Sequence, residues 1–316
     1  MNLIMGTLLA MWLSGAQAVP VPAPAPPPPP PIIGRWDLTV HGTHGDRSAW
    51  LEVRHSGVQT LVGQFVGTSG SARPVSKVDF KDGALRFTIP PQWERVDGDL
   101  VVIGRLDGDR LKGTMTLANG EPMQWTGVRA PSLRRTAPPR WDAPVTLLKP
   151  SGLDGWHATG DNQWEVSNGV LHNRKSGGNL VTDRLFSDFK LHLEFRYPKG
   201  GNSGVYLRGR YEVQIADIAG DQMLPDALGA VYGYLAPNQP AAMNPGDWQS
   251  FDITLVGRLV TVVLNGKTII TNQEIPGITG AALDSHEGEP GPLLLQGDHG
   301  PVEFRNVIVT PVKPSA

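Results

Sequence analysis

Hydrophobic and polar residues alternate with a period of two in many short runs along this chain. Successive side chains of a strand point to opposite faces, so each such run predicts a strand. Before residue 130, strands are predicted at 36–40, 49–54, 60–66, 84–89, 99–104, 111–117 and 123–127. Asp-Gly and Asn-Gly pairs, which suit tight hairpin turns, fall between several of them. This half is expected to be an up-and-down meander that closes toward a small, lipocalin-like barrel.

The second half repeats the pattern without any long amphipathic helix. Strands are predicted at 164–166, 169–172, 180–182, 189–196, 249–255, 259–264, 268–270, 293–296 and 302–309. Asn265-Gly266 marks one hairpin turn between them. Many short strands with regular turns indicate a sandwich or jelly roll. The predicted fold class is therefore all-β throughout.

The stretch from Gly200 to Asp217 organises this second half. It is interpreted as two short strands joined at a sharp corner, where Gly209 can adopt a positive φ. Alternation then places Arg208, Glu212 and Gln214 on one face, opposite a hydrophobic face. A cation, a carboxylate and an amide suit a polyhydroxylated ligand, whereas an ordinary solvated sheet face is the structural alternative.

Further polar side chains are predicted to join that face. In strand 189–196, His192 and Glu194 point away from the leucines. Gln296 and His299 follow the penultimate strand, where Asp298 is positioned to orient His299. Together these residues supply an acid, a base and fixed hydrogen-bonding groups.

Length and composition set the broader limits. A chain of 316 residues suggests two domains, assigned here to 32–130 and 145–316 with a linker at 131–144. The absence of cysteine excludes disulfides and thiolate chemistry, and a net charge of −2 argues against nucleic acid as a partner. The spacing of His41, His44 and His55 invites a metal site, but no further ligand completes one. The first domain is interpreted as an accessory or docking module, with Trp36, Trp50, Trp93 and Trp125 in its core or at its end.

The N-terminus carries an export signature. Residues 1–18 have a short apolar core that ends in Ala16-Gln-Ala18, which predicts a signal peptide. An uncleaved anchor is the alternative, although the run is short for a bilayer span. Residues 19–31 are a proline-rich spacer. We expect a periplasmic or extracellular protein with no transmembrane span after signal cleavage.

Several motifs point to one family. Asn202-Ser-Gly-Val-Tyr-Leu-Arg208 followed by Tyr211-Glu-Val-Gln-Ile215 resembles the signature of the 3-keto-disaccharide hydrolase domain family. Gly152-Leu-Asp-Gly-Trp156, Gly246-Asp-Trp-Gln249 and Leu295-Gln-Gly-Asp-His-Gly300 occur in the same order. The resemblance covers roughly residues 145–312 and implies a concanavalin-A-like lectin/glucanase fold with sugars on its concave face.

The resemblance also implies an activity: removal of the C2 proton of a 3-keto-glycoside, elimination, and hydration. Glu212 and His299 are then the candidate acid and base, in either assignment, and Arg208 and Gln214 are candidates for holding the keto and hydroxyl oxygens. The remaining candidate contacts to an oligosaccharide or glycoside substrate are His192, Glu194, Asn202, Asp217 and Gln296. No cofactor is clearly indicated; a divalent cation that polarises the ketone is the alternative.

Two other functions remain open at this stage. One is a non-catalytic lectin module that uses the same face. The other is a glucanase-type glycoside hydrolase, because Glu212, Gln214 and Asp217 echo the Glu-x-Asp-x-x-Glu motif of laminarinase-type enzymes. The amide at Gln214 disfavours that mechanism, since retaining glycosidases need two carboxyl groups.

Overall fold

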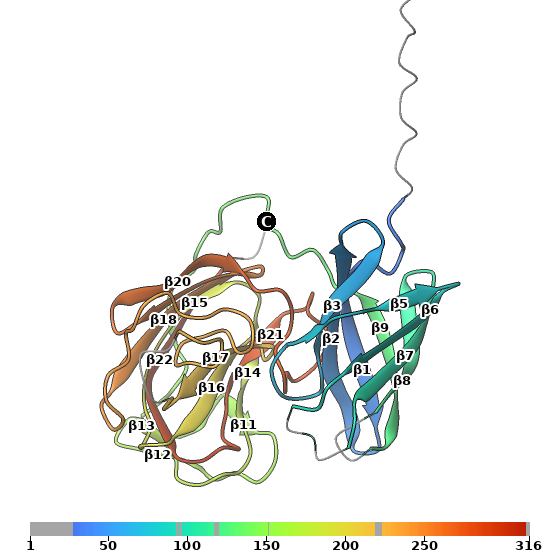
Figure 1. The fold of residues 1–316 in the computed structure, drawn as a ribbon. Coiled ribbons are helices and arrows are strands. Elements are labelled where there is room, and N and C mark those ends of the chain that lie inside the picture. Colours follow the sequence, from blue (N-terminus) through green and yellow to red (C-terminus); the bar gives the residue numbers. More distant parts are fainter. Residues whose placement is uncertain are drawn as a thin grey trace, which may run out of the picture. The chain divides into compact units, whose positions relative to one another are not determined.

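A computed structural model describes residues 28–92, 94, 97–116, 120–150, 152–218 and 223–313 (Figure 1). These residues form strands, turns and loops without a helix, so the predicted all-β class is confirmed. No helix long and apolar enough to cross a membrane occurs in the described part of the chain. The predicted signal peptide and most of the predicted spacer lie outside the described residues, as does Trp93.

The first nine strands form one antiparallel sheet, in the order β4-β3-β2-β1-β9-β8-β7-β6-β5. Consecutive strands are neighbours almost throughout, as in the predicted meander, and β4 lies near β6. The strands are β1 (Gly34–Gly42), β2 (Gly45–Ser56), β3 (Thr60–Val66), β4 (Arg73–Val75), β5 (Asp79–Lys81), β6 (Ala84–Ile89), β7 (Leu100–Asp107), β8 (Arg110–Thr116) and β9 (Pro122–Arg129). We call this unit the barrel domain.

Alternation explains how the barrel domain folds. Trp36, Leu38 and Val40 of β1 are fully buried, together with Phe87 and Trp125 from distant strands. They belong to one hydrophobic cluster, because the sheet curls around its apolar face. The short edge strands β4 and β5 were not predicted, since three residues are too few to show a period.

The rest of the described chain forms two further antiparallel sheets. The larger has the order β12-β13-β22-β15-β18-β19-β20, with β10 paired to β22, and the smaller has the order β11-β14-β21-β16-β17. Their strands are β10 (Val145–Thr146), β11 (Trp156–Ala158), β12 (Trp164–Ser167), β13 (Val170–Asn173), β14 (Leu180–Phe186), β15 (Phe189–Arg196), β16 (Asn202–Leu207), β17 (Tyr211–Ala216), β18 (Gln249–Val256), β19 (Leu259–Leu264), β20 (Lys267–Glu274), β21 (Gly291–Leu295) and β22 (Val302–Pro311).

These two sheets enclose one core and make a β-sandwich, as the sequence predicted. Leu191 and Phe195 of the larger sheet and Val213 and Ile215 of the smaller sheet lie in the same buried cluster. The predicted corner at Gly209 is present with a φ of 68°, and Asn265-Gly266 forms a hairpin turn with positive φ at both residues. The sandwich domain therefore presents one outward face of each sheet to its surroundings.

The described residues from Ile32 onward make one compact unit, in which the barrel and sandwich domains share apolar contacts. Trp50, on β2 of the barrel domain, is buried in the hydrophobic cluster of the sandwich domain rather than in that of the barrel. Its ring lies edge-on to Tyr234, with 5.8 Å between the ring centroids. The Ser48 hydroxyl donates to the carbonyl of Ala282 at 2.8 Å. The boundaries assigned from sequence, at 131–144, remain a prediction.

Candidate active site

The outward face of the smaller sheet carries the candidate site. In β17, Val213 and Ile215 enter the core, so Glu212 and Gln214 project from the opposite face. Strand β16 pairs with β17 so that Tyr206 lies directly opposite Glu212. The antiparallel register therefore brings side chains from both arms of the hairpin into one place.

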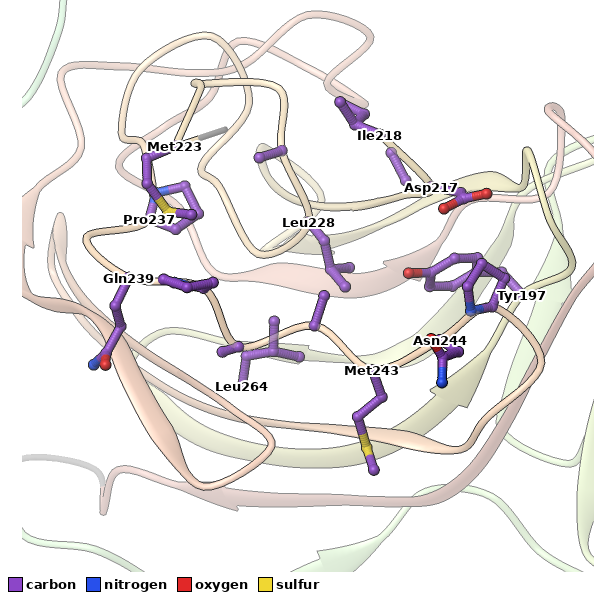
Figure 2. Close-up of a pocket in the computed structure, with 16 residues that line it drawn as sticks. Tyr197, Asp217, Ile218, Met223, Leu228, Pro237, Gln239, Met243, Asn244 and Leu264 are labelled. Carbon is purple, nitrogen blue, oxygen red and sulfur yellow. The ribbon is translucent and has the colours of Figure 1, made fainter. Parts of the chain in front are cut away.

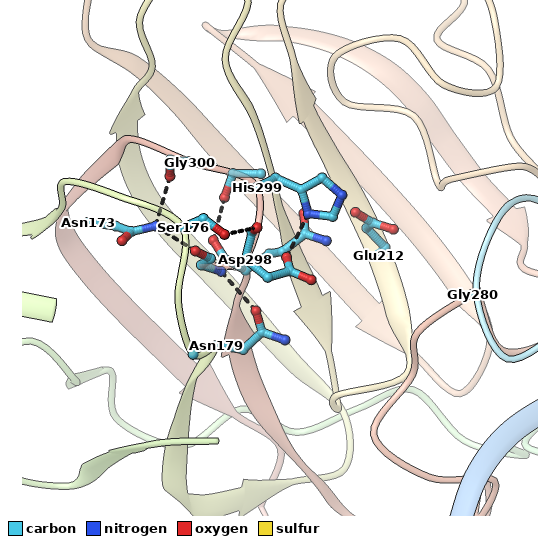
Figure 3. Close-up of polar contacts among 12 residues, drawn as sticks. Asn173, Ser176, Asn179, Glu212, Gly280, Asp298, His299 and Gly300 are labelled. Atoms are coloured by element: carbon cyan, nitrogen blue, oxygen red, sulfur yellow. Dashed lines mark hydrogen bonds and ion pairs between the residues drawn. The ribbon is translucent and has the colours of Figure 1, made fainter. Parts of the chain in front are cut away.

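A pocket of about 360 Å³ lies over this face. It is lined by Ser69, Gly70, Asn202, Tyr206, Glu212, Gln214, Tyr232, Gly280, Ala281, Gln296, Asp298 and His299. Six of the residues singled out from the sequence are among them: Glu212, His299, Asp298, Gln214, Asn202 and Gln296. Figure 3 shows the imidazole ring of His299 and the carboxyl group of Glu212 facing each other, with Asp298 beside the ring.

Glu212 is only 4% exposed and is held at both carboxyl oxygens. The Tyr206 hydroxyl is hydrogen-bonded to Oε2, with 2.9 Å between the two oxygen atoms. The side-chain amide of Gln214 is best oriented with its nitrogen toward two acceptors. In that orientation it donates to the carbonyl of Ser203 at 3.0 Å and to Glu212 Oε1 at 3.3 Å. The carboxyl group is thus fixed in position.

Burial raises the pKa of Glu212 to about 8, although the bond from Tyr206 and the charge of His299 act against that rise. The geometry agrees with a neutral carboxyl group. The Tyr206 hydroxyl also lies 3.1 Å from the carbonyl oxygen of Gly280, but it has one proton for two acceptors. A protonated Glu212 can donate to Tyr206, which leaves the tyrosine proton for Gly280.

His299 is paired with its chain neighbour. Nδ1 lies 2.6 Å from Oδ1 of Asp298, and this hydrogen bond is the main cause that raises the pKa of His299 above its usual 6.5. An N–H at Nδ1 that donates to Asp298 leaves Nε2 as the proton acceptor. The imidazole is therefore oriented as a base that can reach the pocket.

The loop that carries this pair is held by three side chains from a neighbouring segment. Asn173 donates to the carbonyls of Gly297 and Gly300, and Asn179 accepts from the N–H of Gly297 at 2.9 Å. Ser176 donates to the backbone carbonyl of Asp298. These contacts, drawn in Figure 3, fix the backbone on both sides of His299.

Three polar groups in the pocket are available to a ligand. Asn202 Oδ1 and Gln296 Oε1 are buried and accept no hydrogen bond from any described residue. The Tyr232 hydroxyl likewise has no hydrogen-bond partner among the described residues, and burial raises its pKa. Buried polar groups normally find partners, so this arrangement suits a ligand rich in hydroxyl groups.

Arg208 does not lie in this pocket, contrary to the sequence-based expectation. Its φ is 53°, in the left-handed region, so strand alternation ends before it. The guanidinium is buried and donates to the Tyr211 hydroxyl and to the carbonyl of Gly257, both at 2.9 Å. Arg208 thus stabilises the corner of the hairpin instead of contacting the pocket.

His192 and Glu194 are also placed elsewhere. Both belong to β15 of the larger sheet, whose outward face is not the one that carries Glu212. His192 pairs with Asp252 at 2.8 Å, and Glu194 accepts from Arg305 at 2.7 Å. Alternation places both side chains on the outward face of β15, but it does not determine which of two sheets a strand joins.

Asp217 contributes to a different cavity. Its carboxylate accepts the N–H of Gly200 at 2.7 Å, and it lines a cavity of about 300 Å³ with Tyr197 and Met243. Figure 2 shows this second cavity, where apolar side chains such as Leu228 and Leu264 predominate. The Glu-x-Gln-x-x-Asp motif is therefore split between two cavities.

Some residues of the pocket were not singled out from the sequence. Tyr206 follows the same alternation as Glu212, so its position in the motif was a usable signal. Ser69 and Gly70 come from the barrel domain, and no local pattern connects them to β17. Tyr232 lies in a loop and gives no periodic signal.

The described histidine and carboxylate side chains do not cluster in the way that metal ligands do. Among the described residues, no group of three or more histidine and carboxylate side chains lies close enough to hold a metal ion. His41 instead lies 3.0 Å from Asp46 and 2.9 Å from Thr126.

These features define the class of protein: a β-sandwich domain whose pocket holds a buried carboxyl group opposite an aspartate–histidine pair. The profile of the 3-keto-alpha-glucoside-1,2-lyase-like domain matches residues 144–310, which is more than half of the chain. The chain therefore belongs to this family, and the resemblance seen in the sequence motifs is confirmed. No curated relative matches the chain.

Solved structures with partial likeness include proteins provisionally named glycosyl hydrolases. One from Parabacteroides distasonis is 28% identical, and the match spans 52% of this chain and 82% of that protein, with a TM-score of 0.47. A second protein from that organism is 19% identical, and the match spans 54% of this chain and 94% of that protein, with a TM-score of 0.46. The carbohydrate-binding module CBM66 from Bacillus subtilis is 15% identical, and the match spans 49% of this chain and 95% of that module, with a TM-score of 0.33. At these TM-scores the likenesses do not define the activity.

Proposed function

We propose that this protein is a carbohydrate-active enzyme that cleaves a 3-keto-glycoside by elimination and then hydration. The observation that carries the proposal is the placement in one pocket of the Glu212 carboxyl group, whose pKa burial raises to about 8, and the His299 imidazole, which Asp298 orients. Binding a sugar needs hydrogen bonds only, whereas proton transfer needs a donor and an acceptor. The family to which residues 144–310 belong supports the same substrate class.

Each residue takes a role that follows from its surroundings. The ketone at C3 acidifies the C2–H bond, and His299 Nε2 accepts that proton. The electron pair moves into an enolate at C3 and then expels the glycosidic oxygen from C1, while Glu212 gives its proton to the leaving oxygen. The Tyr232 hydroxyl donates to the enolate oxygen, in place of the role first expected of Arg208.

Water completes the reaction. Elimination leaves a C1–C2 double bond conjugated with the C3 ketone. Addition of hydroxide at C1, with return of the proton to C2, gives the free 3-keto sugar, so the overall change is hydrolysis. The Glu212 carboxylate formed in the first stage can take the proton from the attacking water. Asn202 and Gln296 accept hydrogen bonds from sugar hydroxyl groups throughout.

The test uses a 3-keto-disaccharide and its non-oxidised parent, both in D₂O. We expect release of sugar, transient enone, and deuterium at C2 from the keto substrate only. The exchange signal reports the base directly, because C2 deuteration requires removal of that proton. Turnover of the parent at the same rate would instead indicate ordinary glycoside hydrolysis. Binding of either sugar without exchange or turnover would indicate a lectin.

A further inference from the structure

The barrel domain reaches the pocket through the turn that follows β3. Ser69 and Gly70 lie in this turn, residues 68–71, and line the same cavity as Glu212 and His299. The other lining residues all belong to the sandwich domain. The domain interpreted from sequence as an accessory module thus supplies part of the pocket surface.

Backbone packing holds the 68–71 turn against the sandwich domain. A Cβ atom on Gly280 would lie 2.1 Å from the carbonyl oxygen of Gly70, so only glycine permits this approach. A Cβ on Gly233 would lie 2.7 Å from the backbone nitrogen of Ala72. The N–H of Ala281 donates to the carbonyl of Thr68 at 3.3 Å. Close backbone contact on both sides of the turn leaves it little freedom to move away.

The turn is also linked to the proposed acid. Gly280, against which Gly70 packs, accepts a hydrogen bond from the Tyr206 hydroxyl at 3.1 Å. The same hydroxyl contacts Glu212 Oε2 at 2.9 Å. Displacement of the turn would therefore disturb the hydrogen bonds that keep the carboxyl group in place.

The barrel domain is anchored near the turn. Trp50 is buried in the core of the sandwich domain, and a Cβ on Gly277 would lie 2.2 Å from its indole ring. Strand β2, which carries Trp50, pairs with β3, so that Trp50 lies opposite Val66 just before the turn. The turn is consequently a fixed wall rather than a lid.

We propose that the 68–71 turn of the barrel domain is part of the substrate-binding pocket and a determinant of which glycosides fit. The class of substrate in this inference rests on the proposed function. The position of the turn in the pocket wall does not depend on it. A pocket of about 360 Å³ is at the small end of the range for ligand sites. A fixed wall on one side of it favours a short glycoside or a chain end over the interior of a glycan.

The absence of cysteine from this chain allows a direct test. In full-length Ser69→Cys, the new thiol is the sole site for a bulky maleimide. Full-length Val58→Cys is the matched control, because Val58 is 89% exposed in the turn at the opposite end of β3. Each variant is compared before and after labelling, so the unlabelled protein reports any effect of the substitution itself.

Two readouts are taken. The first is kcat/KM for the 3-keto-disaccharide, which we expect to fall at least tenfold on labelling Cys at 69, mainly through KM, and to stay unchanged on labelling at 58. The second is the rate at which diethyl pyrocarbonate modifies His299, followed by peptide mass spectrometry. The His299 side chain is 46% exposed, so the reagent can reach it. We expect the label at 69 to slow this modification severalfold.

The second readout needs no turnover, which separates the two proposals. If no 3-keto substrate is turned over, the proposed function fails, and slower modification of His299 still supports the wall. An unchanged modification rate after labelling at 69 overturns the wall, whatever the activity. If labelling at 69 slows the modification of His299 but leaves kcat/KM unchanged, the turn lies beside His299, and its proposed role in substrate fit is overturned.

Discussion

At the scale of single residues, Glu212 is the side chain on which the proposed chemistry depends most. Glu212→Gln keeps the shape and the hydrogen bonds to Tyr206 and Gln214 but removes the acidic proton. Turnover of a 3-keto-disaccharide should fall by about 10²–10⁴-fold, the usual worth of a positioned acid or base. A 3-keto-glucoside with a nitrophenol leaving group should lose far less, because that group leaves without protonation.

His299→Gln is the counterpart of this variant. It should abolish C2 deuteration and lower turnover of both substrates alike, since both require loss of the C2 proton. If Glu212→Gln, rather than His299→Gln, abolishes C2 deuteration, the roles of acid and base are exchanged. If Glu212→Gln unfolds the protein, Glu212 is a structural residue instead.

The pH dependence follows from the same two groups. His299 must be neutral to accept a proton, so activity should rise through its pKa, which lies above 6.5. Glu212 must be protonated, so activity should fall through its pKa near 8. The profile of kcat/KM should be a bell between these limits.

Asp298→Asn provides the check on that assignment. Asp298 raises the pKa of His299, so loss of its charge should move the acidic limb of the profile to lower pH. The alkaline limb, set by Glu212, should move much less. An acidic limb that stays in place would show that another group controls it.

At the scale of elements, the contact between Trp50 and the 275–282 segment holds the two domains together. The methyl carbon added by Gly277→Ala would lie 2.2 Å from the indole ring of Trp50, which is well inside van der Waals contact. We expect a loss of about 1–3 kcal/mol in the free energy of unfolding, as for other overpacked sites. Gly160→Ala is the control, because its Cβ would meet nothing closer than 3.8 Å. Urea unfolding measures both, and Trp50→Phe combined with Gly277→Ala should recover part of the loss.

The same scale shows where strand alternation is sufficient. It identified β15 and β17 and the correct faces of both, because each has one side in a hydrophobic core. It placed Glu194 beside Glu212 wrongly, because the two strands lie in different sheets. Arg208 was misplaced for a local reason: the positive φ at the corner ends the alternation.

At the scale of the whole molecule, a buried carboxyl group lies between the domains. Asp37 of β1 is 2% exposed, and burial together with the negative charge of Glu287 raises its pKa well above 3.8. The folded state then holds a proton that the unfolded state releases, so stability decreases as pH rises above about 4. This group contributes a slope of up to about 1.4 kcal/mol per pH unit.

Asp37→Asn should remove that contribution, because the amide keeps the shape and cannot ionise. Denaturant unfolding between pH 5 and 8 should therefore show a flatter decline than in the wild type. Asp109→Asn is the control, since the Asp109 side chain is 89% exposed. An unchanged slope in Asp37→Asn would show that Asp37 is ionised in the folded protein.

Export is the remaining prediction at this scale. The apolar run before Ala16-Gln-Ala18 predicts cleavage after Ala18, so the mature protein should begin at Val19 and occur outside the cytoplasm. N-terminal sequencing of protein from the native cell envelope measures this. Recovery of chains that begin with Met1 would contradict it.

The all-β class, most of the strands, the family, and the face that carries Glu212 and Gln214 could be predicted from the amino-acid sequence. These depend on local periodicity and on motifs within a few residues, which the chain displays directly. Which sheet each strand joins, and which side chains meet across that sheet, became evident from the three-dimensional structure. It excluded His192, Glu194 and Arg208 from the pocket and added the 68–71 turn of the barrel domain. The reason is physical: long-range strand pairing and backbone contact through glycine leave no periodic trace in the sequence.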